Sequence, residues 1–198
     1  MPKHTHEDAI SALILAGGKS SRMGTDKALL CWQGVPLLAR VCQVALQCCP
    51  RVYVLTPWPD RYQHLLPGSC QTLVEETPGE GPLVALGQGL RHIQTPWVLL
   101  LACDLPLLNP RVLQRWFTVL EGCETMAAVP YQNGRWEALC GFYHRQGQPQ
   151  LQSFLAQGGR SFQQWLPTLP TEKIAVDAEA ASMLWNCNSP QDLISTEI

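Results

Sequence analysis

The sequence lacks any long hydrophobic segment. Its longest apolar run, from Trp97 to Cys103, is far shorter than the ~20 residues that a membrane-spanning helix needs. The first residues, which include Lys3, His4 and Glu7, lack the apolar centre of a secretory signal. We therefore expect a cytoplasmic protein with no membrane partner.

Positive charge is also scarce. The 14 Lys and Arg residues are scattered along the chain and are outnumbered by 16 Asp and Glu residues, which gives a net charge of -2. Proteins that bind nucleic acid usually concentrate basic residues on one face or in one segment. The composition therefore argues against nucleic acid as a partner.

Cysteine is plentiful, but paired cysteine motifs are absent. The sequence has nine cysteines, an odd number, and contains no C-x-x-C pair. A zinc site or a disulfide framework is therefore a weaker interpretation than reduced and mostly buried thiols in a reducing compartment.

No linker, internal repeat or low-complexity segment divides the 198 residues. This length suits one domain with one sizeable core. We expect a single domain over residues 1–198, in which residues 1–9 form a disordered tail.

Short apolar runs alternate with helical patterns along the first 120 residues. The expected strands are 12–15, 51–55, 72–75 and 97–102, and the expected helices are 36–48, 82–93 and 110–120. This alternation is typical of βαβ units around a mainly parallel, buried sheet, and it predicts an α/β fold. Pro36, Pro82 and Pro110 suit the first turns of the helices, and Asn109 suits the cap before Pro110.

Beyond residue 124 the pattern is less regular. Apolar runs at 126–129, 138–143 and 174–176 predict strands, and residues 149–156 predict a helix. We expect antiparallel additions to the sheet in this C-terminal half. Ligands bind beyond the carboxyl ends of the strands in open parallel sheets, so the loops that follow strands are where we look for chemistry.

The loop after the first expected strand combines glycine with positive charge. Its sequence is LAGGKSSRMGTDK, in which Gly17 and Gly18 allow backbone N–H groups to approach an anion and Lys19, Arg22 and Lys27 supply cations. The spacing matches neither G-x-x-x-x-G-K-[ST] nor G-x-G-x-x-G. We interpret the loop as a phosphate-binding loop; the alternative is a flexible surface loop with solvated side chains.

Two further loops carry carboxylates. Asp104 follows the run of leucines that ends the fourth expected strand, where a single hard oxygen ligand suits Mg²⁺. Its alternative role is to cap a turn before Pro106. The loop EETPGEGPL can place Glu76 against a base or ribose, although surface acidity explains Glu75, Glu76 and Glu80 equally well.

Four segments together resemble a known family. LAGGKSSRMGTDKALL, EETPGEGPLVAL, CDLP and WNCNSPQDL are similar to the bacterial molybdenum cofactor guanylyltransferases, within the nucleotidyltransferase superfamily. The resemblance runs from Ile14 to Leu193, and its most specific part is the first loop. The Gly17-Gly18 pair resembles the guanylyl branch more than the cytidylyl and sugar branches, which usually have A-A-G there.

The resemblance implies a Rossmann-like three-layer fold with a variable acceptor side. It implies that GMP is transferred from GTP to the phosphate of a molybdopterin-type cofactor, with release of pyrophosphate and with Mg²⁺ as cofactor. Molybdoenzyme chaperones are further implied partners. Two alternatives stay open: the same chemistry with CTP or a sugar phosphate, and a noncatalytic module that binds GTP.

The resemblance also assigns residues to the nucleotide. Leu15, Ala16 and Gly17 match the family's nucleotide-binding backbone, Lys27 its phosphate lysine, and Asp104 its carboxylate for GTP and Mg²⁺. In the expected mechanism Arg22 and Lys27 neutralise the triphosphate, while amides near Gly17 and Gly18 hold it in register.

Other positions match the family less closely. Glu76 falls where relatives have Asp at the guanosine. Thr56 falls where many relatives have Asn, and we expect it to replace that polar contact in part. On the acceptor side the candidates lie in late segments of the chain: Glu137, Arg160, Asn186 and Asn188. The alternative role for Asn188 is to cap a helix that begins at Pro190.

Overall fold

The computed structural model describes residues 9–17, 26–120, 124–187 and 192. Most of the expected N-terminal tail, residues 1–8, lies outside this part of the chain. Ala9, which we assigned to the same tail, packs against the core instead.

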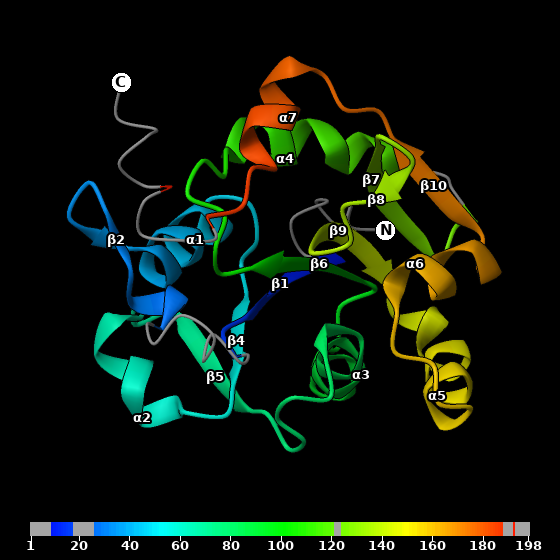
Figure 1. Ribbon diagram of the computed structural model, residues 1–198, viewed down its shortest axis with the longest axis horizontal. Coiled ribbons are helices and arrows are strands. Elements are labelled where there is room, and N and C mark those ends of the chain that lie inside the picture. Colours follow the sequence, from blue (N-terminus) through cyan, green and yellow to red (C-terminus); the bar gives the residue numbers. More distant parts are fainter. Residues whose placement is uncertain (1–8, 18–25, 121–123, 188–191, 193–198) are drawn as a thin grey trace, which may run out of the picture.

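A single large sheet forms the middle layer of the molecule (Figure 1). Its strands follow the order β10-β7-β9-β6-β1-β4-β5, and β8 pairs with β7. Strand β9 runs antiparallel to β6 and β7, and β8 is antiparallel to β7, whereas the remaining pairs are parallel. The strands are β1 (Ile10–Leu15), β4 (Val52–Thr56), β5 (Cys70–Val74), β6 (Trp97–Ala102), β7 (Ala127–Gln132), β8 (Arg135–Trp136), β9 (Cys140–His144) and β10 (Thr171–Ile174).

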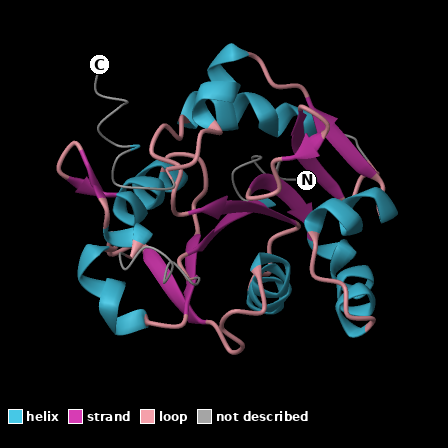
Figure 2. Ribbon diagram, in the orientation of Figure 1, coloured by secondary structure: helices cyan, strands magenta, loops and turns pink. Residues whose placement is uncertain are grey.

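Helices cover both faces of the sheet, as Figures 1 and 2 show. One face carries α1 (Leu37–Leu46), α4 (Pro110–Phe117) and α7 (Ala178–Met183), and the other carries α3 (Pro82–His92), α5 (Gln148–Ala156) and α6 (Phe162–Trp165). The short α2 (Pro59–Tyr62) follows β4. In the described ranges, short 3-10 turns complete these elements at Lys27–Leu29, Gln63–Leu65, Thr118–Leu120, Arg145–Gly147 and Leu166–Thr168. Within the described residues, every helix is too short or too polar to cross a membrane.

Burial on both faces explains why the strand sequences are so apolar. In β6, Leu99 and Leu101 belong to the core under α1 and α4, while Val98 and Leu100 belong to the core under α3. A strand covered by helices on both sides has no polar face, so its apolar run is continuous. The expected α/β fold, with three layers, a mainly parallel sheet and antiparallel additions in the C-terminal half, is confirmed.

Several local expectations need correction. Pro82 and Pro110 do begin their helices, and the Asn109 side chain accepts a hydrogen bond from the Arg111 amide. Pro36, however, ends strand β3 (Val35–Pro36), which pairs with β2 (Cys31–Trp32), so α1 begins one residue later. We did not predict this hairpin, whose two-residue turn at 33–34 has positive φ angles of 50° and 75°.

The last strand is also displaced from its expected position. We expected residues 174–176, whereas β10 comprises Thr171–Ile174. Only Ile174 is buried in this strand, so hydrophobic pattern alone located its end and not its beginning.

Gly89 provides a test of the packing between α3 and the sheet. A Cβ at this position would collide with Cδ2 of Leu13, a side chain with no exposed surface. Although alanine favours a helix by ~1 kcal/mol over glycine, we expect overpacking to exceed that gain. Gly89→Ala should lower the free energy of unfolding by about 1 to 2 kcal/mol, measured by urea denaturation.

Gly68→Ala is the matched control, because a Cβ at this exposed glycine meets no atom within 4 Å. It should leave the stability within about 0.5 kcal/mol of the parent. If Gly89→Ala were as stable as the control, the result would contradict the close packing of α3 on the Leu13 side chain of β1.

Candidate active site

The candidate site lies where β1 and β6 end. These two parallel strands are neighbours in the sheet, so their carboxyl ends meet at the same edge. The chain continues from β1 to β4 and β5 on one side, and then returns to form β6 on the other side of β1. Such a switch in direction opens a crevice between the loops after the two strands, which is the usual ligand site of open α/β sheets.

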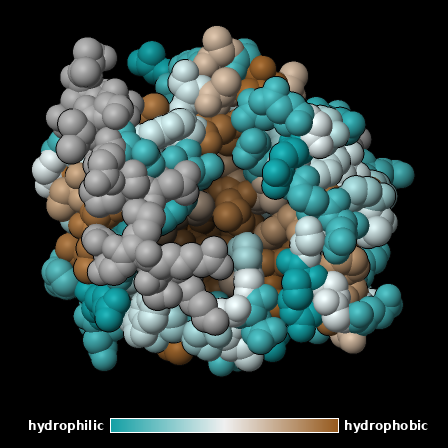
Figure 3. Space-filling view, viewed as in Figure 1, coloured by the Kyte–Doolittle hydropathy of each residue, from teal (hydrophilic) through white to brown (hydrophobic). Residues whose placement is uncertain are grey.

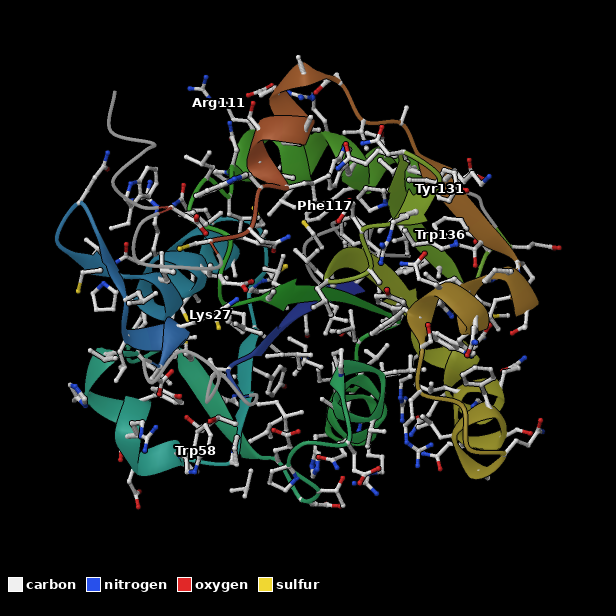
Figure 4. The ribbon with its side chains drawn as sticks, viewed as in Figure 1. Lys27, Trp58, Arg111, Phe117, Tyr131 and Trp136 are labelled. Carbon is white, nitrogen blue, oxygen red and sulfur yellow. The ribbon has the colours of Figure 1, made fainter. Side chains whose placement is uncertain are left out.

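Lys27 and Asp104 meet at this edge. The Lys27 Nζ lies 3.1 Å from Oδ2 of Asp104, although the two residues are 77 positions apart in sequence. Their side chains are 26% and 18% exposed, so the pair is partly shielded and still accessible from solvent. Figure 4 shows Lys27 close to the ends of the two strands. The structure therefore brings together the two side chains that the sequence indicated for a triphosphate and its cation.

Asp26 holds the preceding backbone in place. Its Oδ1 accepts a hydrogen bond from the Ala28 amide at 3.1 Å. Its Oδ2 accepts one from the Tyr62 hydroxyl at 2.7 Å and forms an ion pair with Arg61 at 3.0 Å. Tyr62 is almost fully buried, so the loop that carries Lys27 is anchored to α2 and the core. We did not assign this role to Asp26, because no local signal links it to a helix 35 residues away.

A row of four residues crosses the edge of the sheet. The ladders join β6, β1, β4 and β5 at a common rung, in which Leu15 pairs with the neighbouring strands on both sides. Two positions beyond this rung the four chains reach Asp104, Gly17, Pro57 and Glu75 at the same edge of the sheet, and Pro57 and Glu75 lie against Gly17. The row extends from the Lys27–Asp104 pair towards β5.

Gly17 is required by its neighbours in this row. A Cβ at Gly17 would lie 2.7 Å from Oε2 of Glu75 and 2.8 Å from Cδ of Pro57. Any larger residue would displace the carboxylate or the proline ring. The absence of a side chain therefore allows three strand ends to come close together at the point where the loop begins.

The backbone predicted to bind nucleotide is partly engaged in the sheet. Leu15 is the last residue of β1, and the Ala16 amide donates to the Leu55 carbonyl at 2.9 Å. Gly17 is therefore the first position beyond the ladder. Gly18 and Arg22 lie outside the described residues, so their roles stay predictions.

Glu76 contacts α3. Its carboxylate forms an exposed ion pair with Arg91 at 2.6 Å, and its amide donates to Oε1 of Gln88 at 3.0 Å. Gln88 is only 6% exposed and donates from Nε2 to the Thr77 hydroxyl. A buried glutamine thus fixes this loop, while the proposed contact of Glu76 with guanosine stays a prediction.

Glu75 lies in a different environment from Glu76. It is half-buried, and its carboxylate forms no hydrogen bond or ion pair within the part of the chain that the structure describes. Burial raises the pKa of this carboxyl group above its ordinary value. The sequence offered no reason to separate Glu75 from its acidic neighbours, because only the strand register turns it towards Gly17.

Thr56 is unsuited to the ligand contact that we expected. Its side chain has no exposed surface, and its hydroxyl oxygen accepts a hydrogen bond from the Trp58 amide at 3.1 Å. The expected replacement of a polar base contact by Thr56 is therefore wrong. The next residue in the row is Pro57, which offers an apolar ring instead.

A pocket of about 260 Å³ is lined in part by Leu105, the residue that follows Asp104 in the chain. The Asp104 carbonyl accepts a hydrogen bond from the Cys187 amide at 2.9 Å. Figure 3 shows that this face is hollowed near its middle and that apolar residues gather there. The residues that line the pocket are Pro82, Leu105, Trp136, Glu137, Ala138, Leu139, Cys140, Phe162, Gln163, Leu184 and Asn186.

The pocket contains two of the four expected acceptor residues. Glu137 and Asn186 both line it, and Oε1 of Glu137 accepts a hydrogen bond from Gln132 at 3.0 Å. Arg160 does not line it: this residue pairs with Glu80 at 3.4 Å and donates to the Leu155 carbonyl at 3.0 Å. Asn188 lies outside the described residues.

Cys103 is not suited to act as a nucleophile beside Asp104. Burial, together with the nearby carboxylates of Asp104 and Asp26, raises the pKa of its thiol to about 12. A neutral thiol is a poor nucleophile and a poor metal ligand. All cysteines in the described ranges are free thiols, in agreement with the expectation of reduced cysteine.

Comparison with known proteins identifies relatives over almost the whole chain. Residues 12–171 match the family described as MobA-like NTP transferase domain. A probable molybdenum cofactor guanylyltransferase of Nostoc sp. is 50% identical over 93% of this chain and 88% of its own length. A protein of the same description from Synechococcus elongatus is 44% identical, over 92% of this chain and 95% of its own length.

Solved structures share the fold at lower sequence identity. Molybdopterin-guanine dinucleotide biosynthesis protein A from Archaeoglobus fulgidus superposes with a TM-score of 0.77 at 20% identity, over 95% of this chain and all of its own. A nucleotidyl transferase from Methanothermobacter superposes with a TM-score of 0.73 at 18% identity, over 96% of both chains.

The environment of Glu75 predicts a pH-dependent stability. Because its pKa is raised in the folded chain, the ionised carboxylate destabilises the fold above the folded pKa, and this cost is lost as the pH falls through that value. Glu75→Gln removes the buried charge. It should therefore increase the free energy of unfolding at neutral pH, and its advantage should shrink in mild acid, as measured by urea denaturation at both pH values.

Glu172→Gln is the control, because Glu172 is exposed on β10 at the opposite edge of the sheet. It should leave stability unchanged at both pH values. A neutral or destabilising effect of Glu75→Gln at neutral pH would mean that the carboxylate has a stabilising partner.

Proposed function

The chain belongs to the MobA-like NTP transferase family, and we propose that it is a molybdenum cofactor guanylyltransferase. It transfers GMP from GTP to the terminal phosphate of a molybdopterin-type cofactor and releases pyrophosphate. The product is the guanine dinucleotide form of the cofactor.

The contact between Lys27 and Asp104 is the observation that carries this proposal. A cation and a carboxylate 3.1 Å apart at the carboxyl edge of β1 and β6 can serve a triphosphate and its counter-ion together. Each group enters from a separate loop, and Asp26 and the sheet restrain those loops. This prior positioning is what a transfer between two phosphates demands.

The residues present fit a magnesium ion. Among the described residues no three His, Cys, Asp or Glu side chains gather into a metal site. Mg²⁺ suits such a setting, because it keeps several waters and takes further ligands from substrate phosphates, with one or two carboxylates from the protein. Asp104 would hold the ion, which supplies charge neutralisation at the phosphate oxygens.

The mechanism requires positioning more than proton transfer. An oxygen of the acceptor phosphate forms the new bond to the α-phosphorus of GTP, and the bond from that phosphorus to pyrophosphate breaks on the opposite side. The acceptor phosphate is already ionised at neutral pH, so no general base is needed. Lys27 neutralises charge on the triphosphate, and we propose the same for Arg22, with amides at Gly17 and Gly18 orienting the phosphates.

The pocket beside Asp104 supplies the acceptor side. Its walls are largely apolar and include the Trp136 ring, which suits a flat pterin, while Glu137 and Asn186 provide polar groups at its border. The backbone hydrogen bond from the Cys187 amide to the Asp104 carbonyl ties the segment that carries Asn186 to the backbone of Asp104, and Leu105 in the wall follows Asp104 directly. The acceptor phosphate can therefore approach the triphosphate from this pocket.

Removal of either member of the pair should abolish turnover. Asp104→Ala and the shape-preserving Asp104→Asn should each lower kcat at least about 100-fold, because a charge that acts on the reacting phosphates is lost. Lys27→Met should have a similar effect. The measurement is Mg²⁺-dependent pyrophosphate release with GTP and the pterin acceptor, with CTP assayed in parallel to decide the nucleotide.

Asp60→Asn serves as the control, because Asp60 is exposed on α2. It should retain parental kcat, and all variants should keep the parental circular dichroism spectrum. Full activity of a folded Asp104→Ala protein would refute the proposed role. GTP binding without pyrophosphate release by the parent would favour a noncatalytic module.

The acceptor pocket predicts a different kinetic signature. Glu137→Gln and Asn186→Ala should raise KM for the pterin acceptor about 10-fold, because each removes one polar contact from a partly enclosed site. The Kd for GTP should stay within about 2-fold of the parent, because these side chains lie on the other side of Asp104 from β5. Calorimetry with GTP and initial rates against acceptor concentration separate the two quantities; a parallel loss of GTP affinity would contradict separate subsites.

A further inference from the structure

We infer that Gln163 positions the aromatic wall of the acceptor pocket, because its side chain holds both backbone groups of Trp136. Gln163 lies on α6, and Trp136 is the second residue of β8. The inference rests on the proposed function, since it concerns the pocket that receives the pterin acceptor. Gln163 acts on the acceptor through Trp136, so it is a positioning residue.

The amide group of Gln163 makes a paired contact with the backbone of Trp136. Its Oε1 accepts a hydrogen bond from the Trp136 amide at 3.0 Å, and its Nε2 donates one to the Trp136 carbonyl at 2.7 Å. The two residues are 27 positions apart in sequence, so the contact joins two separate elements. Two hydrogen bonds to one residue fix both its distance and its orientation, whereas one bond leaves a rotation free.

Strand β8 has few other restraints. It is two residues long and pairs with β7 through Tyr131 and Gln132. The turn at 133–134, with φ angles of 50° and 77°, shapes this hairpin but does not fix it against α6. Two paired strands are marginally stable by themselves in water. Gln163 therefore supplies to β8 the two hydrogen bonds that a further strand would make.

The ring of Trp136 is restrained from the side of the sheet. The Tyr131 ring meets it edge to face, with centroids 4.7 Å apart, and Figure 4 shows the two residues at the same end of the sheet. The Lys173 ammonium on β10 lies 4.1 Å from the centroid of the Tyr131 ring and 5.7 Å from that of Trp136. These contacts restrain the indole, and Gln163 restrains the backbone that carries it.

The helix that carries Gln163 is anchored independently of this contact. Phe162 and Trp165 on α6 are both buried, and each packs against the ring of Tyr143. Loss of the Gln163 amide therefore leaves the packing of α6 intact. What it releases is Trp136, which lines the pocket together with Gln163.

A held aromatic wall suits a flat heterocycle. Stacking between rings depends on their offset and relative tilt, so a displaced indole loses much of the contact. A wall that is already in place also spares the acceptor the entropy of ordering it. Removal of the Gln163 contact should therefore weaken acceptor binding and leave the nucleotide subsite unchanged.

Gln163→Met tests the inference, because methionine has a similar length and makes neither hydrogen bond. The KM for the pterin acceptor should rise about 10-fold, while kcat and the KM for GTP stay within about 2-fold of the parent. Amide hydrogen exchange in residues 131–137, measured by mass spectrometry, should become at least about 10-fold faster. Gln164→Met is the matched control, because Gln164 is the next residue on the same helix and is exposed. It should change neither quantity.

A double-mutant cycle separates positioning from direct contact. In a Trp136→Leu background, Gln163→Met should raise the acceptor KM further by only about 2-fold or less, because the ring that it positions is gone. A full 10-fold rise in that background would overturn the inference, since Gln163 would then act on the acceptor by another route. Parental acceptor KM and parental hydrogen exchange in Gln163→Met would also overturn it.

A second variant guards against a general loss of structure. Gln163→Glu still accepts from the Trp136 amide but cannot donate to its carbonyl, so it should raise the acceptor KM with kcat unchanged. Failure of both variants to fold, or an equal loss in acceptor and GTP binding, would assign Gln163 a structural role and refute the inference.

Failure of the proposed function has a separate signature. In that case the parent would release no pyrophosphate from GTP in the presence of the acceptor. Calorimetric Kd values for 6-hydroxymethylpterin phosphate then still test Gln163, because the wall acts on binding. A Kd about 10-fold higher in Gln163→Met supports the inference, whereas equal Kd values, or no binding of this pterin by the parent, refute it.

Discussion

The adjacency of β1 and β6 is the constraint on which the site depends. Parallel neighbours end at the same edge, so the loops after these two strands must share one crevice. Lys27 and Asp104 meet there because their strands are held in register by a ladder buried on both faces. Without that ladder, a lysine and an aspartate 77 residues apart would have no reason to come within 3.1 Å.

Loops at this edge are positioned by polar side chains that are partly or fully buried. Asp26 ties the first loop to Tyr62, and Gln88 ties the loop at Glu76 to α3. Buried polar groups that are fully satisfied specify a single arrangement, so each anchor limits where its loop can lie. Glu75 is the exception, since its half-buried carboxylate has no described partner. The edge is therefore restrained where these side chains hold the backbone, and one carboxylate at it lacks a compensating partner among the described residues.

The antiparallel part of the sheet provides the second half of the site. Strand β9 reverses direction beside β6, and the segment that leads into it carries Trp136 and Glu137 to the wall of the pocket. The late segment at Asn186 closes the opposite side and contacts the backbone of Asp104. Parallel strands thus supply the phosphate edge, while the reversal brings an apolar pocket next to it.

The sequence by itself determined the features that depend on local chemistry. The buried run of β6, the proline starts of α3 and α4 and the glycine-rich loop all follow from residues close together in the chain. Lys27 and Asp104 could be identified as candidates because each follows an expected strand. Asp26 and Glu75 could not be assigned in this way, since their neighbours Tyr62 and Gly17 are distant in sequence, and the burial of Thr56 depends on the packed sheet. Only the tertiary structure decided which carboxylates are paired and which face the ligand edge, because strand order and register are properties of the packed sheet.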